Sequence, residues 1–120
     1  MALAFLRTKY GRIDLRQPLY IAVDGGHTSV VVMHDTPRSG AGGQVVAELK
    51  NEGQSGNNIS QLHAIADSLA NAIAYANAYV AKTPEEGTAW MLSFEPVGDS
   101  YWTMNRADEN PGVTPVYHIK

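Results

Sequence analysis

The segment from Ile59 to Lys82 constrains the fold most strongly, because its apolar residues recur every three or four positions. That spacing aligns them along one side of an α-helix. Asn58 stands where an N-cap would be, Gln61 follows as in a capping box, and Thr83-Pro84 ends the pattern. The apolar stripe consists of Ile59, Leu62, Ile65, Leu69, Ile73, Ala76 and Val80. We therefore predict one long helix near residues 58–82.

The sequence on both sides of this helix has the pattern of β-strands. Residues 12–17 alternate charged and apolar side chains, whereas the later runs are rich in β-branched and aromatic residues. The predicted strands are 12–17, 18–23, 28–33 and 44–49 before the helix, and 88–95, 100–106 and 114–120 after it. A chain of 120 residues has the length of a single domain. We predict an α+β domain over residues 1–120, with a mostly antiparallel sheet of about six or seven strands packed on one long helix.

The stretch Asp24-Gly25-Gly26-His27-Thr28 allows two interpretations. Its glycines and Thr28 could expose backbone N–H groups to a phosphate. A two-residue turn at Gly25-Gly26 accounts for more of the pattern, because glycine accepts the positive φ of tight hairpins. That turn sets Val23 opposite Thr28, Ile21 opposite Val30 and Leu19 opposite Val32, which leaves one face apolar. We therefore favour the hairpin.

Composition limits the classes of protein to which the chain can belong. The absence of cysteine excludes disulfides, thiolate zinc sites and thiol nucleophiles. No apolar run has the length of a membrane span, and the N-terminal charges follow a short apolar run, which is the reverse of a signal peptide. We expect a cytoplasmic protein without a membrane partner. The net charge of −3 argues against binding nucleic acid over the whole surface.

The basic residues gather near the N-terminus. Four of the nine Lys and Arg residues lie in positions 1–16, where Asp14 is the one acid. This basic patch consists of Arg7, Lys9, Arg12 and Arg16. It could attract a phosphate backbone or an acidic partner. The alternative is a solvated edge strand whose charges discourage aggregation.

Two further segments are candidates for binding a small anion. Arg38 lies in the glycine-rich loop 36–43, which could act as a ligand flap or be an ordinary loop. The residues Ser55, Gly56, Asn57 and Asn58 lead into the helix, where free N–H groups attract anions but also require capping.

The histidines offer little for metal or cofactor chemistry. No pair of them has the spacing of a zinc-binding helix, and we expect neither a metal nor a cofactor. His63 and Asp67 lie four residues apart on the predicted helix, so that they could touch. We interpret them as a local hydrogen-bonded pair, with acid–base catalysis as the alternative.

The outward side of the helix is unusually poor in charge, since Asp67 is the one charged residue between Ile59 and Ala81. Small residues at four-residue steps allow another backbone to approach, and tyrosine is enriched at interfaces. The predicted contact surface consists of Ala66, Ala70, Asn71, Ala74, Tyr75 and Ala78. We expect a partner there, most simply a second copy of the chain.

These signals favour a non-catalytic binding or interaction protein that forms a homo-oligomer and recognises a partner macromolecule or a small anionic ligand. An accessory protein or an inhibitor, such as a phage directs against a host defence system, would have this character. One alternative is a small enzyme that uses His63 and Asp67 or the loop from Asp24 to Thr28. Another is a nucleic-acid binder that uses the basic N-terminal segment.

Overall fold

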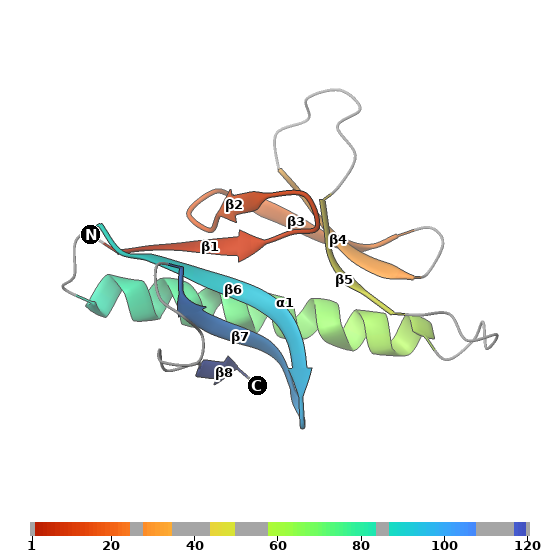
Figure 1. The fold of residues 1–120 in the computed structure, drawn as a ribbon. Helices are drawn as coiled ribbons and strands as arrows, with labels where there is room; N and C mark the ends of the chain where they lie inside the picture. Colours follow the sequence, from red (N-terminus) through yellow and green to blue (C-terminus); the bar gives the residue numbers. More distant parts are fainter. Residues whose placement is uncertain are drawn as a thin grey trace.

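A single long helix packs against two β-sheets, and in Figure 1 it passes behind β6 and β7. The computed structural model describes residues 2–24, 28–34, 44–49, 58–83, 87–107 and 117–119. Within these ranges the strands form a five-stranded sheet in the order β2-β1-β6-β7-β8 and a three-stranded sheet in the order β3-β4-β5. The α+β prediction is confirmed. The single sheet that we expected is instead divided in two.

The helix, α1 (Asn58–Lys82), begins and ends where the sequence predicts. Its buried side contacts both sheets, so that it connects the two halves of the core. The apolar period explains this arrangement, since residues three and four apart share one face of a helix. The fully or almost fully buried residues are Leu62, Ile65, Leu69, Ala72, Ala76 and Val80. Ile59 and Ile73 lie at the borders of the stripe and are half-buried.

The five-stranded sheet consists of β1 (Leu3–Arg7), β2 (Arg12–Asp14), β6 (Ala89–Val97), β7 (Ser100–Arg106) and β8 (Tyr117–Ile119). Strand β1 was not predicted, because its apolar run is short and does not alternate with polar residues. It pairs with β6 in parallel, whereas the other three pairings are antiparallel. Gly98, with a φ of 60°, lies in the two-residue turn between β6 and β7.

The three-stranded sheet consists of β3 (Leu19–Val23), β4 (Ser29–His34) and β5 (Gln44–Glu48), all antiparallel. The predicted register of the first hairpin is wrong. Ile21 lies opposite Val32, and Val23 lies opposite Val30. The chain therefore closes over a longer connection than a two-residue turn. Because the shift is by two residues, each side chain keeps its predicted face.

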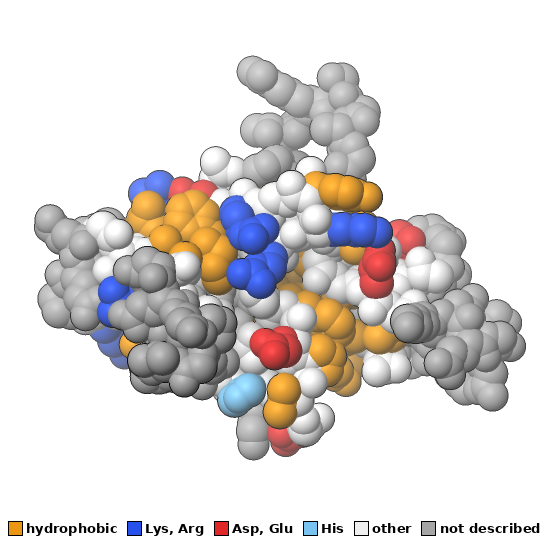
Figure 2. Space-filling model, in the orientation of Figure 1, with side chains coloured by type: hydrophobic (Ala, Val, Ile, Leu, Met, Phe, Trp, Pro, Cys, Tyr) orange, Lys and Arg blue, Asp and Glu red, His pale blue; other side chains and the backbone are white. Residues whose placement is uncertain are grey.

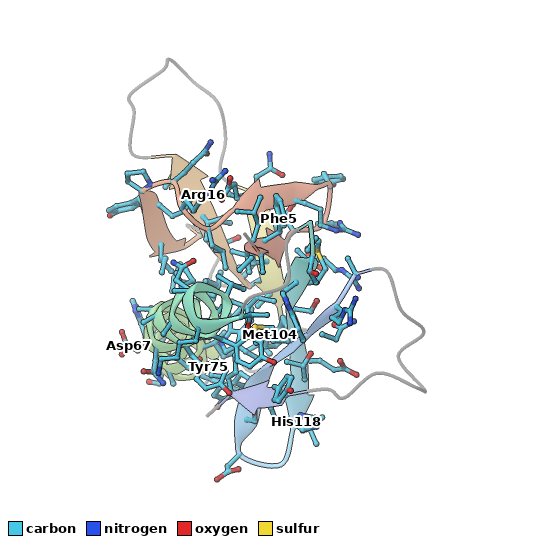
Figure 3. All side chains as sticks on the ribbon, turned by 90° about the vertical axis from the view of Figure 1, so that its left-hand side faces the viewer. Phe5, Arg16, Asp67, Tyr75, Met104 and His118 are labelled. Atoms are coloured by element: carbon cyan, nitrogen blue, oxygen red, sulfur yellow. The ribbon has the colours of Figure 1, made fainter. Side chains whose placement is uncertain are left out.

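The core lies between α1 and the inner faces of the sheets. Met104 points into it from the five-stranded sheet, and Asp67 lies on the far side of the helix (Figure 3). The outer face of the five-stranded sheet, which points away from α1, faces the reader in Figure 1. The two sheets also meet directly, because the N–H of Lys9 donates to the carbonyl oxygen of Val45 at 2.7 Å.

Candidate functional site

A groove of about 490 Å³ runs between β3 and the first half of α1. Four consecutive residues of β3, from Tyr20 to Val23, form one wall. The opposite wall is helical, and it consists of Ile59, His63, Ala66, Asp67 and Ala70. The groove therefore follows the length of a strand rather than surrounding one point, and this shape suits an extended partner.

The wall formed by β3 is a sheet edge. The N–H of Asp24 donates to Ser29 on β4, and main-chain groups alternate in direction along a strand. The N–H and C=O groups of Leu19, Ile21 and Val23 therefore point away from β4. In the described part of the chain no other strand pairs with them. Such unpaired groups are a template for adding a further strand.

The other three sheet edges among the described residues are protected. Strand β2 has three residues and carries Arg12 and Asp14, and β8 also has three residues. The pairing of β5 with β4 is interrupted by a bulge, and Val45 of β5 already accepts a hydrogen bond from Lys9. Strand β3 has five residues, an uninterrupted ladder and no charged side chain. Natural monomers protect their edges with shortness, charge or bulges, and β3 lacks all three devices.

The helix residues of the predicted contact surface lie in different places around the axis. Ala66 is half-buried against the core, and Ala66 and Ala70 line the groove. Tyr75 is about 140° further around than Ala70 at 100° per residue, and its ring stacks on Tyr79 at 6.5 Å. The remaining members are exposed: Asn71, Ala74 and Ala78. Of the predicted contact surface, only Ala66 and Ala70 therefore lie along the β3 edge.

His63 and Asp67 both line the groove and are both exposed. Across the described ranges no hydrogen bond joins them, which differs from the local pair that we predicted. Two exposed side chains are solvated, so that water competes with a bond between them.

The carboxylate of Asp24 closes the base of the loop that follows β3. Its Oδ1 atom accepts hydrogen bonds from the backbone N–H groups of Thr28 at 2.9 Å and Ser29 at 3.1 Å. Its Oδ2 atom accepts the Thr28 hydroxyl. Burial raises the pKa of Asp24, but these bonds outweigh burial and lower the pKa overall. The carboxylate therefore occupies two N–H groups that a phosphate loop would need, which favours a structural role. Gly25, Gly26 and His27 lie outside the described residues.

The predicted basic patch is divided into paired and unpaired cations. Arg16 bonds Asp14 at 2.6 Å, and its hydrogen bonds lower the pKa of that carboxyl group. Lys9 bonds Glu48 at 3.2 Å, which raises the pKa of the lysine. Arg7 and Arg12 have no acidic partner in the described ranges. The structure thus reduces the four-residue patch to two available charges.

The predicted anion residues Arg38, Ser55, Gly56 and Asn57 lie outside the described residues. Asn58 is the first residue of α1, as expected of the helix start, but its side chain is not described. No group of three metal-binding side chains occurs in the parts of the chain that are described. The described helix is not long and apolar enough to cross a membrane.

The unprotected edge of β3 was missed at the level of sequence. The signal was present as an uncharged strand of five residues, but only the sheet order shows that this strand lies at an edge. No protein-family model, no curated protein and no solved structure matches this chain.

Proposed function

We propose that this chain is a non-catalytic interaction protein that self-associates through the edge of β3. The observation that carries the proposal is an uncharged, regular strand edge beside a groove whose helical wall is rich in alanine. Strand addition uses the main-chain groups of the edge for affinity and the neighbouring groove for specificity. We assign the protein to the cytoplasm as part of the same proposal, since a chain without cysteine needs no oxidising compartment.

A second copy fits the edge better than an unrelated chain, because β3 is self-complementary. When two copies pair antiparallel about Ile21, Leu19 of one copy lies opposite Val23 of the other, and Tyr20 lies opposite Ala22. All these side chains lack charge, so that no like charges meet across the interface. Tyr20 is 58% exposed in the single chain and would be covered. The product is a continuous six-stranded sheet with closed two-fold symmetry.

The helical wall of the groove supports the same arrangement. Ala66 and Ala70 are small enough to let the second copy approach α1 beside the joined strands. His63 and Asp67 are the ionisable residues of the groove, and both are exposed, so that they can remain solvated at its rim.

The experiment compares the sedimentation of two double variants with that of the wild type. Tyr20→Lys with Ala70→Glu places a charge on the edge and another in the groove. Tyr10→Lys with Ala78→Glu makes the same chemical changes elsewhere, since Tyr10 is 79% exposed and Ala78 lies outside the groove. At about 10 µM we expect dimers of the wild type and of the control. The first variant should be a folded monomer, because a buried charge without a partner is costly.

Circular dichroism establishes that both variants keep their fold. A monomeric wild type refutes the proposal. Dissociation of both variants to the same extent would place the interface elsewhere on the molecule.

A further inference from the structure

Arg7 on β1 and Arg12 on β2 lie directly opposite each other on the outer face of the five-stranded sheet. The flanking residues show which kind of pair they form. The N–H of Thr8 donates to Gly11, and the N–H of Leu15 donates to Ala4. Hydrogen-bonded and non-hydrogen-bonded pairs alternate along an antiparallel ladder, so Arg7 and Arg12 form a non-hydrogen-bonded pair. This is the pair type in which side chains lie closest together.

Two cations directly opposite each other destabilise a sheet, and no carboxylate of the described residues forms an ion pair with either of them. Lys9 and Arg16, the neighbouring cations, each have a carboxylate partner. Arg12 donates one hydrogen bond to the carbonyl oxygen of Gly11, which carries no charge. The two guanidinium groups therefore create a local positive potential that attracts an anion. Figure 2 shows that Lys and Arg side chains gather on this face near the end of β1.

Arg7 also lines a second groove of about 490 Å³, where β5 passes the ends of β1 and the middle of β6. Ser93 of β6 lines the same groove and is 9% exposed. Its hydroxyl group is buried and has no hydrogen-bond partner among the described residues. An unsatisfied buried hydroxyl group is costly. Ser93 follows Leu92, which pairs with Leu6. In the register of β1 and β6, Ser93 therefore lies beside Arg7.

We propose that Arg7 and Arg12 bind one phosphate group, and that Ser93 donates a hydrogen bond to it from the floor of the groove. A dianionic phosphate neutralises both guanidinium groups, and each guanidinium can donate two parallel N–H bonds. Glu48 and Glu95 line the same groove. They disfavour a long polyanion such as nucleic acid, because successive phosphates would meet these carboxylates. The site therefore suits a phosphate monoester or inorganic phosphate.

The test is a titration of the full chain with inorganic phosphate against chloride at constant ionic strength, followed by NMR of the arginine Nε–H groups. We expect saturable shifts for Arg7 and Arg12 and none for Arg16. Arg7→Gln and Arg12→Gln should each weaken binding by about tenfold or more, since a hydrogen bond to a charged group has that strength. Arg16→Gln removes the same charge outside the site, and its affinity should stay within about twofold of the wild type.

Stability provides a second measurement that does not depend on assigning the spectra. In chloride, Arg12→Gln should melt at the same temperature as the wild type or higher, because it removes the opposition of like charges. Phosphate should raise the melting temperature of the wild type and of Arg16→Gln, and it should raise that of Arg12→Gln by much less. Ser93→Ala should weaken phosphate binding severalfold without a change of charge.

Several results would overturn the proposal. Shifts that grow without saturation, or an equal loss of affinity in all three arginine variants, would indicate unspecific attraction to positive charge. If Ser93→Ala bound phosphate with unchanged affinity, the Ser93 hydroxyl group would not be part of the site. Phosphoserine and a single-stranded oligonucleotide form the comparison arms. Tighter binding of the oligonucleotide with a steep salt dependence would replace the phosphate site with a nucleic-acid surface.

Discussion

At the scale of single residues, Asp24 shows how one carboxylate decides the role of a loop. A pair of glycines beside an aspartate and a threonine can form a phosphate loop or a turn, and the sequence alone does not distinguish these two structures. In the structure, the Asp24 carboxylate accepts hydrogen bonds from the N–H groups of Thr28 and Ser29. The anion that satisfies these donors is thus supplied by the chain itself.

This role predicts a pH dependence of stability. Because the folded protein lowers the pKa of Asp24, its ionised form contributes stability above the unfolded pKa of about 3.9, and the contribution is lost as the pH falls through the folded pKa. Asp24→Asn should therefore reduce the loss of stability between about pH 5 and pH 2. Arg16 also lowers the pKa of Asp14. Asp14 is present in the wild type and in the variant, so its contribution to the pH dependence cancels in the comparison. Urea unfolding at several pH values measures the difference, and identical pH slopes would contradict the assigned role.

At the scale of secondary-structure elements, α1 contains two populations of alanine. Ala72 and Ala76 are completely buried against the sheets, whereas Ala70, Ala74 and Ala78 are exposed. The same residue type thus serves close packing on one side of the helix and is exposed on the other. Helix propensity alone does not distinguish these sides, because alanine favours the helix at every position.

Substitution by leucine should separate the two populations. Ala76→Leu inserts extra carbon atoms where the sheets already touch the helix, and it should lower the free energy of unfolding by about 1–3 kcal/mol. Ala78→Leu adds the same atoms on the exposed side and should change it by less than about 0.5 kcal/mol. Urea unfolding of the two variants provides the comparison. Equal losses would mean that Ala78 is also covered in solution.

At the scale of the whole molecule, α1 connects two sheets that are otherwise in limited contact. The buried residues of both sheets and of the helix form one hydrophobic cluster. Such a continuous core favours unfolding in a single transition, even though the strands belong to separate sheets. The helix is therefore the element on which the stability of both sheets depends.

Leu69→Ala near the middle of the helix tests this dependence. Leu69 is completely buried. Its truncation should lower the free energy of unfolding by about 2–5 kcal/mol, and probes in both sheets should report the same loss. Fluorescence of Trp90 and Trp102 reports on the five-stranded sheet, and hydrogen exchange of residues 29–34 reports on the three-stranded sheet. We expect the same midpoint shift from both probes. Separate transitions would show that the sheets unfold independently.

The sequence by itself determined the helix, its buried side and the approximate positions of seven strands. These features follow from local periodicity, in which each residue is constrained by neighbours a few positions away. The limits of α1 at Asn58 and Lys82 were predicted for this reason. The face on which the side chains of β3 and β4 lie was also predicted, because a shift of two residues preserves it.

Only the tertiary structure decided how the strands are grouped and which groups meet. Strand β1 pairs with β6 across more than 80 positions, and no local pattern encodes that pairing. The same applies to the unprotected edge of β3, to the opposition of Arg7 and Arg12, and to the pairing of Lys9 with Glu48. Both proposed sites consist of groups that pairing between strands leaves without partners. The physical reason is that periodicity fixes which way a side chain points, whereas the free energy of the whole fold fixes what lies opposite it.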